Sequence, residues 1–199
     1  NPVKSASGKV LKIVKFANDI TQTKMSGLES AAKLAAVSRA QATIEFAPDG
    51  QVLDANQNFL EALGYTLDEI VGKNHRMFVD PSDANSQRYV EFWTRLRLGE
   101  YVADEFLRIG KGGRQVHIQA SYNPVFDPGG KVIKVVKFAT DVTSRVENVE
   151  QLAKGLNRFA DGDLSQQIEK PFIPSLEPLR VDFTSASNKL QQAMSTVAD

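Results

Sequence analysis

The chain has 199 residues, a length that suits one domain of roughly 150 residues and leaves a substantial remainder. Lysine plus arginine and aspartate plus glutamate each total 24, so the formal net charge is zero, and the basic excess or stripe typical of a nucleic-acid-binding protein is missing. Apolar residues make up 42%, enough for a buried core, and the absence of cysteine excludes disulfides, thiolate metal sites and a cysteine nucleophile. With only His75 and His117, a metal site built from several imidazoles is also excluded.

The hydropathy pattern contains no apolar run near the ~20 residues that a transmembrane helix needs, and no signal sequence opens the chain. The first residue is not methionine, which we interpret as the mark of a fragment. We therefore expect a cytoplasmic fragment without a membrane segment.

An internal repeat organises the chain. Residues 1–21 read NPVKSASGKVLKIVKFANDIT and residues 123–143 read NPVFDPGGKVIKVVKFATDVT, with 13 of 21 positions identical. The offset of 122 residues is too long for a solenoid repeat and fits one domain plus a connecting helix. We interpret residues 1–23 as the closing strands of a preceding domain, 24–41 as a linker helix and 42–143 as a complete domain.

Each repeat is predicted to form a hairpin that passes directly into a helix, because turn residues precede alternating apolar and polar segments. Ser26 with Glu29, and Ser144 with Glu147, fit the capping box, in which a hydroxyl and a carboxylate satisfy the first helical amides. The connecting helix is accordingly expected over about residues 27–41.

The segment between the two repeats predicts two strands, several helical pieces and two further strands before the closing strand. Turn residues, helix-ending glycines and apolar spacing set the expected bounds. The two strands lie within 42–54, the helical pieces at 56–64, 67–72, 74–78 and 81–98, and the later strands at 101–109 and 114–122. Hairpins at both ends with helices between them predict an α+β fold, a five-stranded antiparallel sheet with helices on one face that enclose a pocket.

From Ser144 onward the apolar spacing alternates steps of three and four, which is typical of a coiled-coil seam. Gly162, Pro171 and Pro174 exclude one continuous helix, so two helices with a connector are predicted. A narrow apolar stripe needs a partner helix; we expect a parallel homodimer, with a hairpin inside one chain as the alternative. The seam consists of Val149, Leu152, Leu156, Phe159, Leu176, Leu179, Phe183, Ala186, Leu190, Ala193 and Val197.

Three segments identify a resemblance: GYTLDEIVGKNHRMFVDP at 64–81, GEYVADEFLRIGKGGRQVHIQASYNPV at 99–125 and KVVKFATDVT at 134–143. Over about residues 43–143 the chain resembles the PAS sensor domains found in tandem in bacterial methyl-accepting chemotaxis receptors. The tail at 144–199, with LNRFADGDL at 156–164, is similar to a HAMP signal-relay module. The resemblance implies a sensory module whose ligand or redox signal passes down dimeric helices to a chemotaxis histidine kinase and coupling protein, bound through a downstream region.

Strand alternation and helix position predict which side chains line the pocket, with packing in an ordinary core as the alternative for each. These side chains are Phe59, Leu63, Met77, Phe78, Tyr89, Trp93 and Phe106.

His75 and His117 are the candidate polar contacts to a cofactor. An imidazole at the pocket mouth can bind haem iron or hydrogen-bond a flavin, and an ordinary surface or capping histidine is the alternative for His75. His117 stands where related chemoreceptor PAS domains often carry tryptophan, and residues 82–98 contain no histidine of the kind that holds haem in oxygen-sensing PAS kinases. The cofactor thus stays open between haem, FAD and none, and no metal site is predicted.

Asp141 and Thr143 are the candidate signal-relay residues, at the junction of the closing strand and the tail. Their side-chain oxygens are expected to accept hydrogen bonds from first-turn amides, each cap contributing about 1 kcal/mol. The resemblance implies a coupling role for this Asp-x-Thr end, and simple capping is the alternative.

Catalysis is not expected, because the carboxylates form no acid and base pair beside a nucleophile. The Gly-Lys-Gly-Gly run at 110–113 lacks the spacing of a phosphate loop and is predicted to be a hairpin turn. The rival functions are a ligand-free PAS domain used for dimerisation and spacing, or the sensor region of a histidine kinase or cyclase.

Overall fold

The computed structural model describes residues 2–13, 15, 19, 21–165 and 167–197. It divides into two compact units, Asn1–Ala40 and Gln41–Asp199. In the first unit, β1 (Pro2–Lys4) and β2 (Val10–Ile13) pair antiparallel, which confirms the predicted N-terminal hairpin. The rest of the expected second strand, at 14, 16–18 and 20, lies outside the described residues.

Helix α1 (Thr21–Ala40) begins earlier than predicted, so the capping box at Ser26 does not start it. Instead, the backbone N–H of Thr21 donates to Asp19 Oδ1 at 2.8 Å. The carboxylate satisfies a first-turn amide and favours the positive end of the helix dipole. Helix α1 therefore starts at the Asp19 cap and not at the Ser-x-x-Glu pattern further along the chain.

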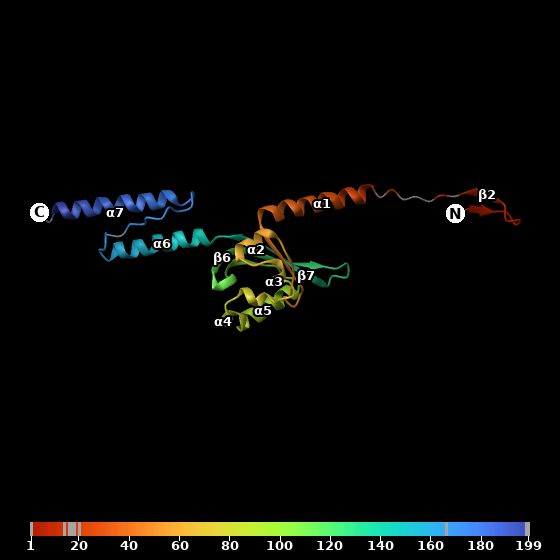
Figure 1. Cartoon of the computed structure of the whole chain (residues 1–199), viewed down its shortest axis with the longest axis horizontal. Helices are drawn as coiled ribbons and strands as arrows, with labels where there is room; N and C mark the ends of the chain where they lie inside the picture. The colour runs from red at the N-terminus through yellow and green to blue at the C-terminus, as the bar shows by residue number, and fades with distance from the viewer. Residues whose placement is uncertain (1, 14, 16–18, 20, 166, 198–199) are drawn as a thin grey trace. The chain divides into compact units, whose positions relative to one another are not determined.

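The second unit contains the predicted five-stranded antiparallel sheet, in the order β4-β3-β7-β6-β5 (Figure 1). Side chains alternate across each strand, and one face of the sheet carries the buried side chains of the core. The turn predicted at 110–113 joins the strands at 102–109 and 115–126 as η2 (Lys111–Gly113). The strands are β3 (Ala42–Phe46), β4 (Val52–Ala55), β5 (Val102–Ile109), β6 (Gln115–Phe126) and β7 (Val132–Asp141).

Short helices between β4 and β5 cover this face, and aromatic side chains fill the core. One expectation is wrong: the helix predicted over 81–98 is two helices, because the Ser86 hydroxyl accepts a hydrogen bond from the backbone N–H of Tyr89 and caps a new start. Asn85 ends the first of them in a non-helical conformation. The helices are α2 (Gln57–Leu63), α3 (Leu67–Ile70), η1 (His75–Phe78), α4 (Pro81–Ala84) and α5 (Gln87–Arg97).

The tail consists of α6 (Thr143–Ala160), a non-helical connector and α7 (Glu177–Val197), as predicted in outline. The two helices run in the same direction, because the connector returns along them (Figure 1). A Cβ added at Gly155 would lie 2.8 Å from the Phe183 ring, so the close approach of the two helices there requires a residue without a side chain. The capping box predicted at Ser144 is wrong as well, since α6 begins at Thr143.

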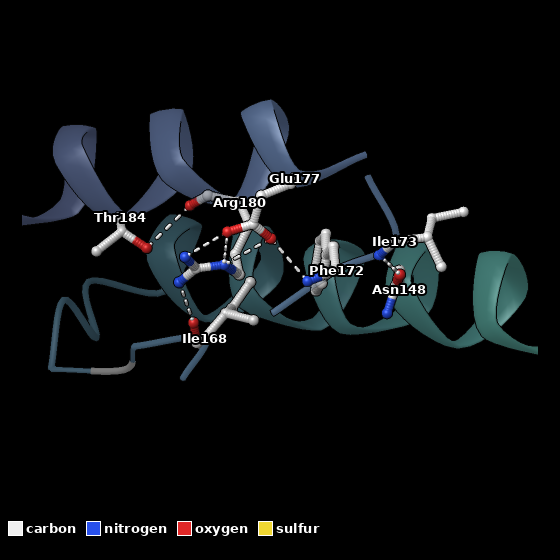
Figure 2. A network of polar contacts seen from close by, with 7 residues as sticks. All are labelled: Asn148, Ile168, Phe172, Ile173, Glu177, Arg180 and Thr184. Atoms are coloured by element: carbon white, nitrogen blue, oxygen red, sulfur yellow. Dashed lines mark hydrogen bonds and ion pairs between the residues drawn. The ribbon is translucent and has the colours of Figure 1, made fainter. Parts of the chain in front are cut away.

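Polar contacts hold the connector against both helices (Figure 2). The buried Asn148 of α6 accepts from the backbone N–H of Ile173 at 2.9 Å. Arg180 of α7 pairs with Glu177 at 2.6 Å and donates to the carbonyl of Ile168 at 2.8 Å. These contacts give the connector a defined path.

The predicted seam is divided between two environments. Phe183 is buried and lies 6.2 Å from the ring of Phe159, so this part of the seam packs inside one chain. Val149, Leu156 and Leu179 each keep about half of their side-chain surface exposed. Part of the seam thus packs within one chain, between helices that run in the same direction (Figure 1) and do not form the hairpin of the alternative, and the homodimer stays a prediction.

Candidate functional site

A groove lies where η1, α4 and α5 meet β5, the edge strand of the sheet. Its cavity volume is about 150 Å³. Apolar rings and charged side chains share its walls, so it can contact both the apolar body and the polar group of a small molecule. The lining residues are His75, Val79, Asp83, Ser86, Arg88, Tyr89, Phe92, Glu105, Phe106, Leu107 and Arg108.

His75 is the deepest polar residue of the groove and is 1% exposed. It sits on η1, whose start is capped by the Asn74 side chain. Its Nδ1 lies 2.9 Å from the hydroxyl of Tyr89, and its Nε2 lies 3.0 Å from the hydroxyl of Tyr122. Both ring nitrogens are thus hydrogen-bonded to tyrosines.

Arg108 determines which groups donate and which accept in this series of hydrogen bonds. It can only donate, and its Nη2 lies 3.2 Å from the hydroxyl oxygen of Tyr122. Tyr122 then has its own proton available for His75 Nε2, which leaves the imidazole proton on Nδ1, facing Tyr89. A neutral His75 then has a partner at each ring nitrogen.

Lys137 projects into the same core from β7, in register with Tyr122 on β6. It is 1% exposed, and its Nζ lies 5.1 Å from the ring centre of Tyr122 and 5.5 Å from that of Phe59. In the described part of the chain no carboxylate pairs with it. Its contacts with the ring faces offset only part of the lost hydration.

Burial shifts the titration of these groups. Burial first, and then the charges of Arg108 and Lys137, hold the pKa of His75 well below its ordinary value of 6.5. Burial, reinforced by Arg108, likewise holds the pKa of Lys137 well below 10.5, and burial raises the pKa of Tyr122. The site therefore opposes any added positive charge.

The His75 environment predicts a loss of stability in mild acid. Below pH 6.5 the unfolded imidazole takes up a proton that the folded one does not, so the free energy of unfolding falls as the pH drops. The contribution is up to about 1.4 kcal/mol per pH unit. Urea denaturation at about pH 7 and about pH 5 measures it.

The matched variants are His75→Gln and His117→Gln. The pH dependence should be clearly weaker in His75→Gln than in the wild type and in His117→Gln, whose ring lies outside the groove. Equal slopes in the wild type and His75→Gln would contradict the burial of a neutral imidazole.

The structure places the other predicted pocket residues at different depths. Phe59, Leu63, Phe78 and Trp93 are buried in the core, and Met77 packs against it. Tyr89 and Phe106 line the groove itself. His117 lies on β6 between the buried Val116 and Ile118, so it faces the opposite side of the sheet.

Arg108, Tyr122 and Lys137 were not predicted from the sequence as residues of the site. Their signal was available as strand alternation: Lys137 shares a face with Val135 and Ala139, and Arg108 with Phe106. A charged residue in phase with apolar neighbours on a core-facing strand is a candidate buried site residue.

The residues present do not fit haem or a flavin. Drug-sized ligands occupy roughly 300–1,000 Å³, well above the 150 Å³ of this groove. An axial haem ligand needs a free imidazole nitrogen, and both nitrogens of His75 are engaged. Among the described residues no cluster of three or more metal-ligating side chains is present either.

The predicted relay residues lie at the junction of β7 and α6. The hydrogen bond of the Thr143 hydroxyl differs from the one predicted. Asp141 Oδ1 accepts from the backbone N–H of Thr143 at 2.8 Å, which is the expected cap. The Thr143 hydroxyl caps nothing on α6; its oxygen accepts from the backbone N–H of His117 at 3.0 Å. The backbone N–H of Val142 donates to the His117 carbonyl at 2.8 Å, so both backbone groups of His117 hold the junction.

A second contact joins the first turn of α6 to β5, the edge strand of the sheet. Arg145 forms an ion pair with Glu105, which also lines the groove. In addition, Leu107 of the groove is the cross-strand partner of His117. The groove and the start of α6 are therefore connected through one pair of β5 residues.

Comparison with known proteins decides the family. A family profile described as the PAS fold matches residues 38–147, more than half of the chain. The chain belongs to the PAS family. This PAS protein is 45% identical over 150 residues to the biofilm dispersion protein BdlA of Pseudomonas aeruginosa, covering 75% of the chain and 36% of that protein. It is 28% identical to the aerotaxis receptor of Escherichia coli, covering 61% of the chain and 23% of the receptor.

Solved structures agree on the fold of this PAS protein. The PAS domain of a Colwellia psychrerythraea protein has a TM-score of 0.50 at 19% identity and covers 58% of this chain and 97% of that one. An RNA-binding light-oxygen-voltage receptor has a TM-score of 0.53 at 21% identity and covers 74% of this chain and 43% of that one. Among the described helices of this PAS protein, none has the length and apolarity to span a membrane.

Proposed function

We propose that this PAS protein is the sensory signal-transduction module of a chemotaxis receptor, in which a change in the groove is relayed through the end of β7 to α6. One observation carries the proposal. His117 holds the first residues of α6 with both of its backbone groups, while its cross-strand partner Leu107 lines the groove.

The relay requires only small movements. A shift of β5 caused by repacking at Phe106 alters the position of His117 through the strand ladder, because β5 and β6 are paired along their whole common length. The Thr143 contact and the Arg145 ion pair then change together. A coupling of about 1–3 kcal/mol is enough to bias a two-state helix pair.

The helical tail is the element to which we propose the signal is passed. We propose that residues 1–23 end a preceding PAS domain, that 24–41 link it to the PAS domain at 42–143, and that 144–199 act as a HAMP-like relay in a cytoplasmic homodimer. The half-exposed Val149, Leu156 and Leu179 support the dimer. The partners downstream would be a chemotaxis histidine kinase and its coupling protein, which the likeness to the aerotaxis receptor supports.

Two other functions have support of their own. A ligand-free PAS domain used for spacing is supported by the dense aromatic core around Phe46. The sensor region of a histidine kinase is supported by 29% identity over 108 residues to a blue-light-activated histidine kinase of Brucella anthropi.

A double-mutant cycle tests the relay without any ligand. Phe106→Ala perturbs the groove, Thr143→Val removes the hydroxyl contact, and amide hydrogen exchange in the first turns of α6 is the measurement. We expect Thr143→Val to abolish most of the effect of Phe106→Ala on α6, with a coupling energy of at least about 0.5 kcal/mol.

The control replaces Tyr65, a partly buried aromatic that packs on Phe78 and does not line the groove. The effects of Tyr65→Ala and Thr143→Val should add. Additivity within about 0.3 kcal/mol for the Phe106 pair as well would reject the relay.

A further inference from the structure

Two basic side chains are buried in the core without an acidic partner. Arg108 is 7% exposed and Lys137 is 1% exposed. The hydrogen bonds of Arg108 go to the carbonyl of Leu107 and the hydroxyl of Tyr122, both neutral. In the described part of the chain its Nε, which is fully buried, has no hydrogen-bond partner.

Burial of these side chains without a bound anion opposes folding. Buried charges are usually paired, and a buried donor left unsatisfied opposes folding. The ion pairs in the described residues all involve other side chains, so neither Arg108 nor Lys137 has a carboxylate partner there. An anion at Arg108 would compensate the charge of its guanidinium.

We propose that the groove binds a small organic carboxylate, with the carboxylate on the Arg108 guanidinium and the apolar body against Phe92 and Phe106. The inference rests on the proposed sensory function and names the class of ligand sensed. A guanidinium presents planar donors that match a carboxylate.

The size and lining of the groove favour this class. A cavity of 150 Å³ matches one known to hold benzene, so a single ring or a short chain fits. The rings of Phe92 and Phe106 lie 6.3 Å apart at the groove, and the Arg108 guanidinium lies 4.6 Å from the centre of the Phe106 ring. Apolar surface and a cation are therefore adjacent.

The acidic groups of the groove do not neutralise its buried end. Asp83 and Glu105 are both exposed, and Glu105 is already paired with Arg145. His75 is kept neutral by burial and by the nearby cations. Positive charge is left unbalanced at Arg108, where a carboxylate is expected.

Calorimetric titration of the 199-residue chain with defined probes tests the proposal. Benzoate is the carboxylate probe, benzamide is its neutral counterpart of the same shape, and inorganic phosphate is the alternative anion. We expect benzoate to bind with a Kd below about 1 mM and benzamide at least about tenfold more weakly. Equal binding of benzamide, tighter binding of phosphate, or no binding of benzoate would overturn the proposal.

Variants locate the site. Arg108→Met should weaken benzoate binding at least about tenfold, and Arg97→Met, which removes an exposed arginine of α5, should leave it within about threefold. Should Arg108→Met fail to fold, Arg108→Lys keeps the charge and removes the planar donors, and should weaken binding at least about threefold. Unchanged affinity in a folded Arg108 variant would place the anion elsewhere and reject the site.

The two proposals fail separately. The double-mutant cycle at Phe106 and Thr143 uses no ligand, so coupling there without benzoate binding rejects only the ligand class. Benzoate binding without coupling rejects only the relay.

Discussion

Replacing Lys137 with methionine is expected to raise the free energy of unfolding at neutral pH by about 1–4 kcal/mol. The ammonium is 1% exposed and contacts the ring faces of Phe59 and Tyr122 in place of water or a carboxylate. Methionine fills a similar volume and carries no charge to desolvate. Urea denaturation measures the difference.

The pH dependence of this gain identifies its cause. Below 10.5 the unfolded lysine is protonated while burial opposes protonation of the folded one, so the wild type is penalised at neutral pH. The penalty is relieved as the pH rises from the lowered folded pKa towards 10.5. The advantage of Lys137→Met should therefore shrink at alkaline pH.

Lys134 provides the matched control on the same strand. It is half-buried on the other face of β7 and pairs with Glu45 at 2.8 Å. Lys134→Met should cost at most about 1 kcal/mol. A destabilised Lys137→Met protein, or equal effects at the two lysines, would contradict the account of an uncompensated buried charge.

Tyr122→Phe is expected to lower the free energy of unfolding by about 2–6 kcal/mol, because two buried groups lose a partner at about 1–3 kcal/mol each. The hydroxyl lies 3.0 Å from His75 Nε2 and 3.2 Å from Arg108 Nη2. The ring itself stays, so the packing against Phe46 and Phe92 is kept.

Chemical denaturation again provides the measurement, with Tyr101→Phe as the control. Tyr101 is 69% exposed, and its hydroxyl removal should change stability by less than about 0.5 kcal/mol. The cost of Tyr122→Phe should also fall in an Arg108→Met background, where one of the orphaned groups is gone. A loss at Tyr122 no larger than at Tyr101 would mean that the network contributes nothing to stability.

The sheet and its hairpins were predicted correctly, because the residues that specify each turn and each strand lie close together in the sequence. The 123–143 repeat contains the turn and alternation of one hairpin, and residues 110–113 contain the turn of another. Helix starts were less predictable, because several polar side chains near each end compete for the same amides. Asp19 rather than Ser26 caps α1, and Ser86 divides the helix predicted over 81–98.

The aromatic part of the site was predictable, since apolar spacing assigned Tyr89 and Phe106 to the inner side of the domain. The charged part had only a partial signal in strand alternation. Alternation shows that Lys137 shares a face with Val135 and Ala139, and does not say that this face is covered by helices along its full length.

The amino-acid sequence by itself determined the five-stranded antiparallel sheet and the helical tail, because strand alternation, turn chemistry and heptad spacing act within a few residues. Only the tertiary structure decided that Arg108 and Lys137 are buried together, and that the Thr143 hydroxyl contacts His117 in place of its own helix. These contacts join residues from separate strands. Their partners are selected by strand register and packing, which no short window of sequence contains.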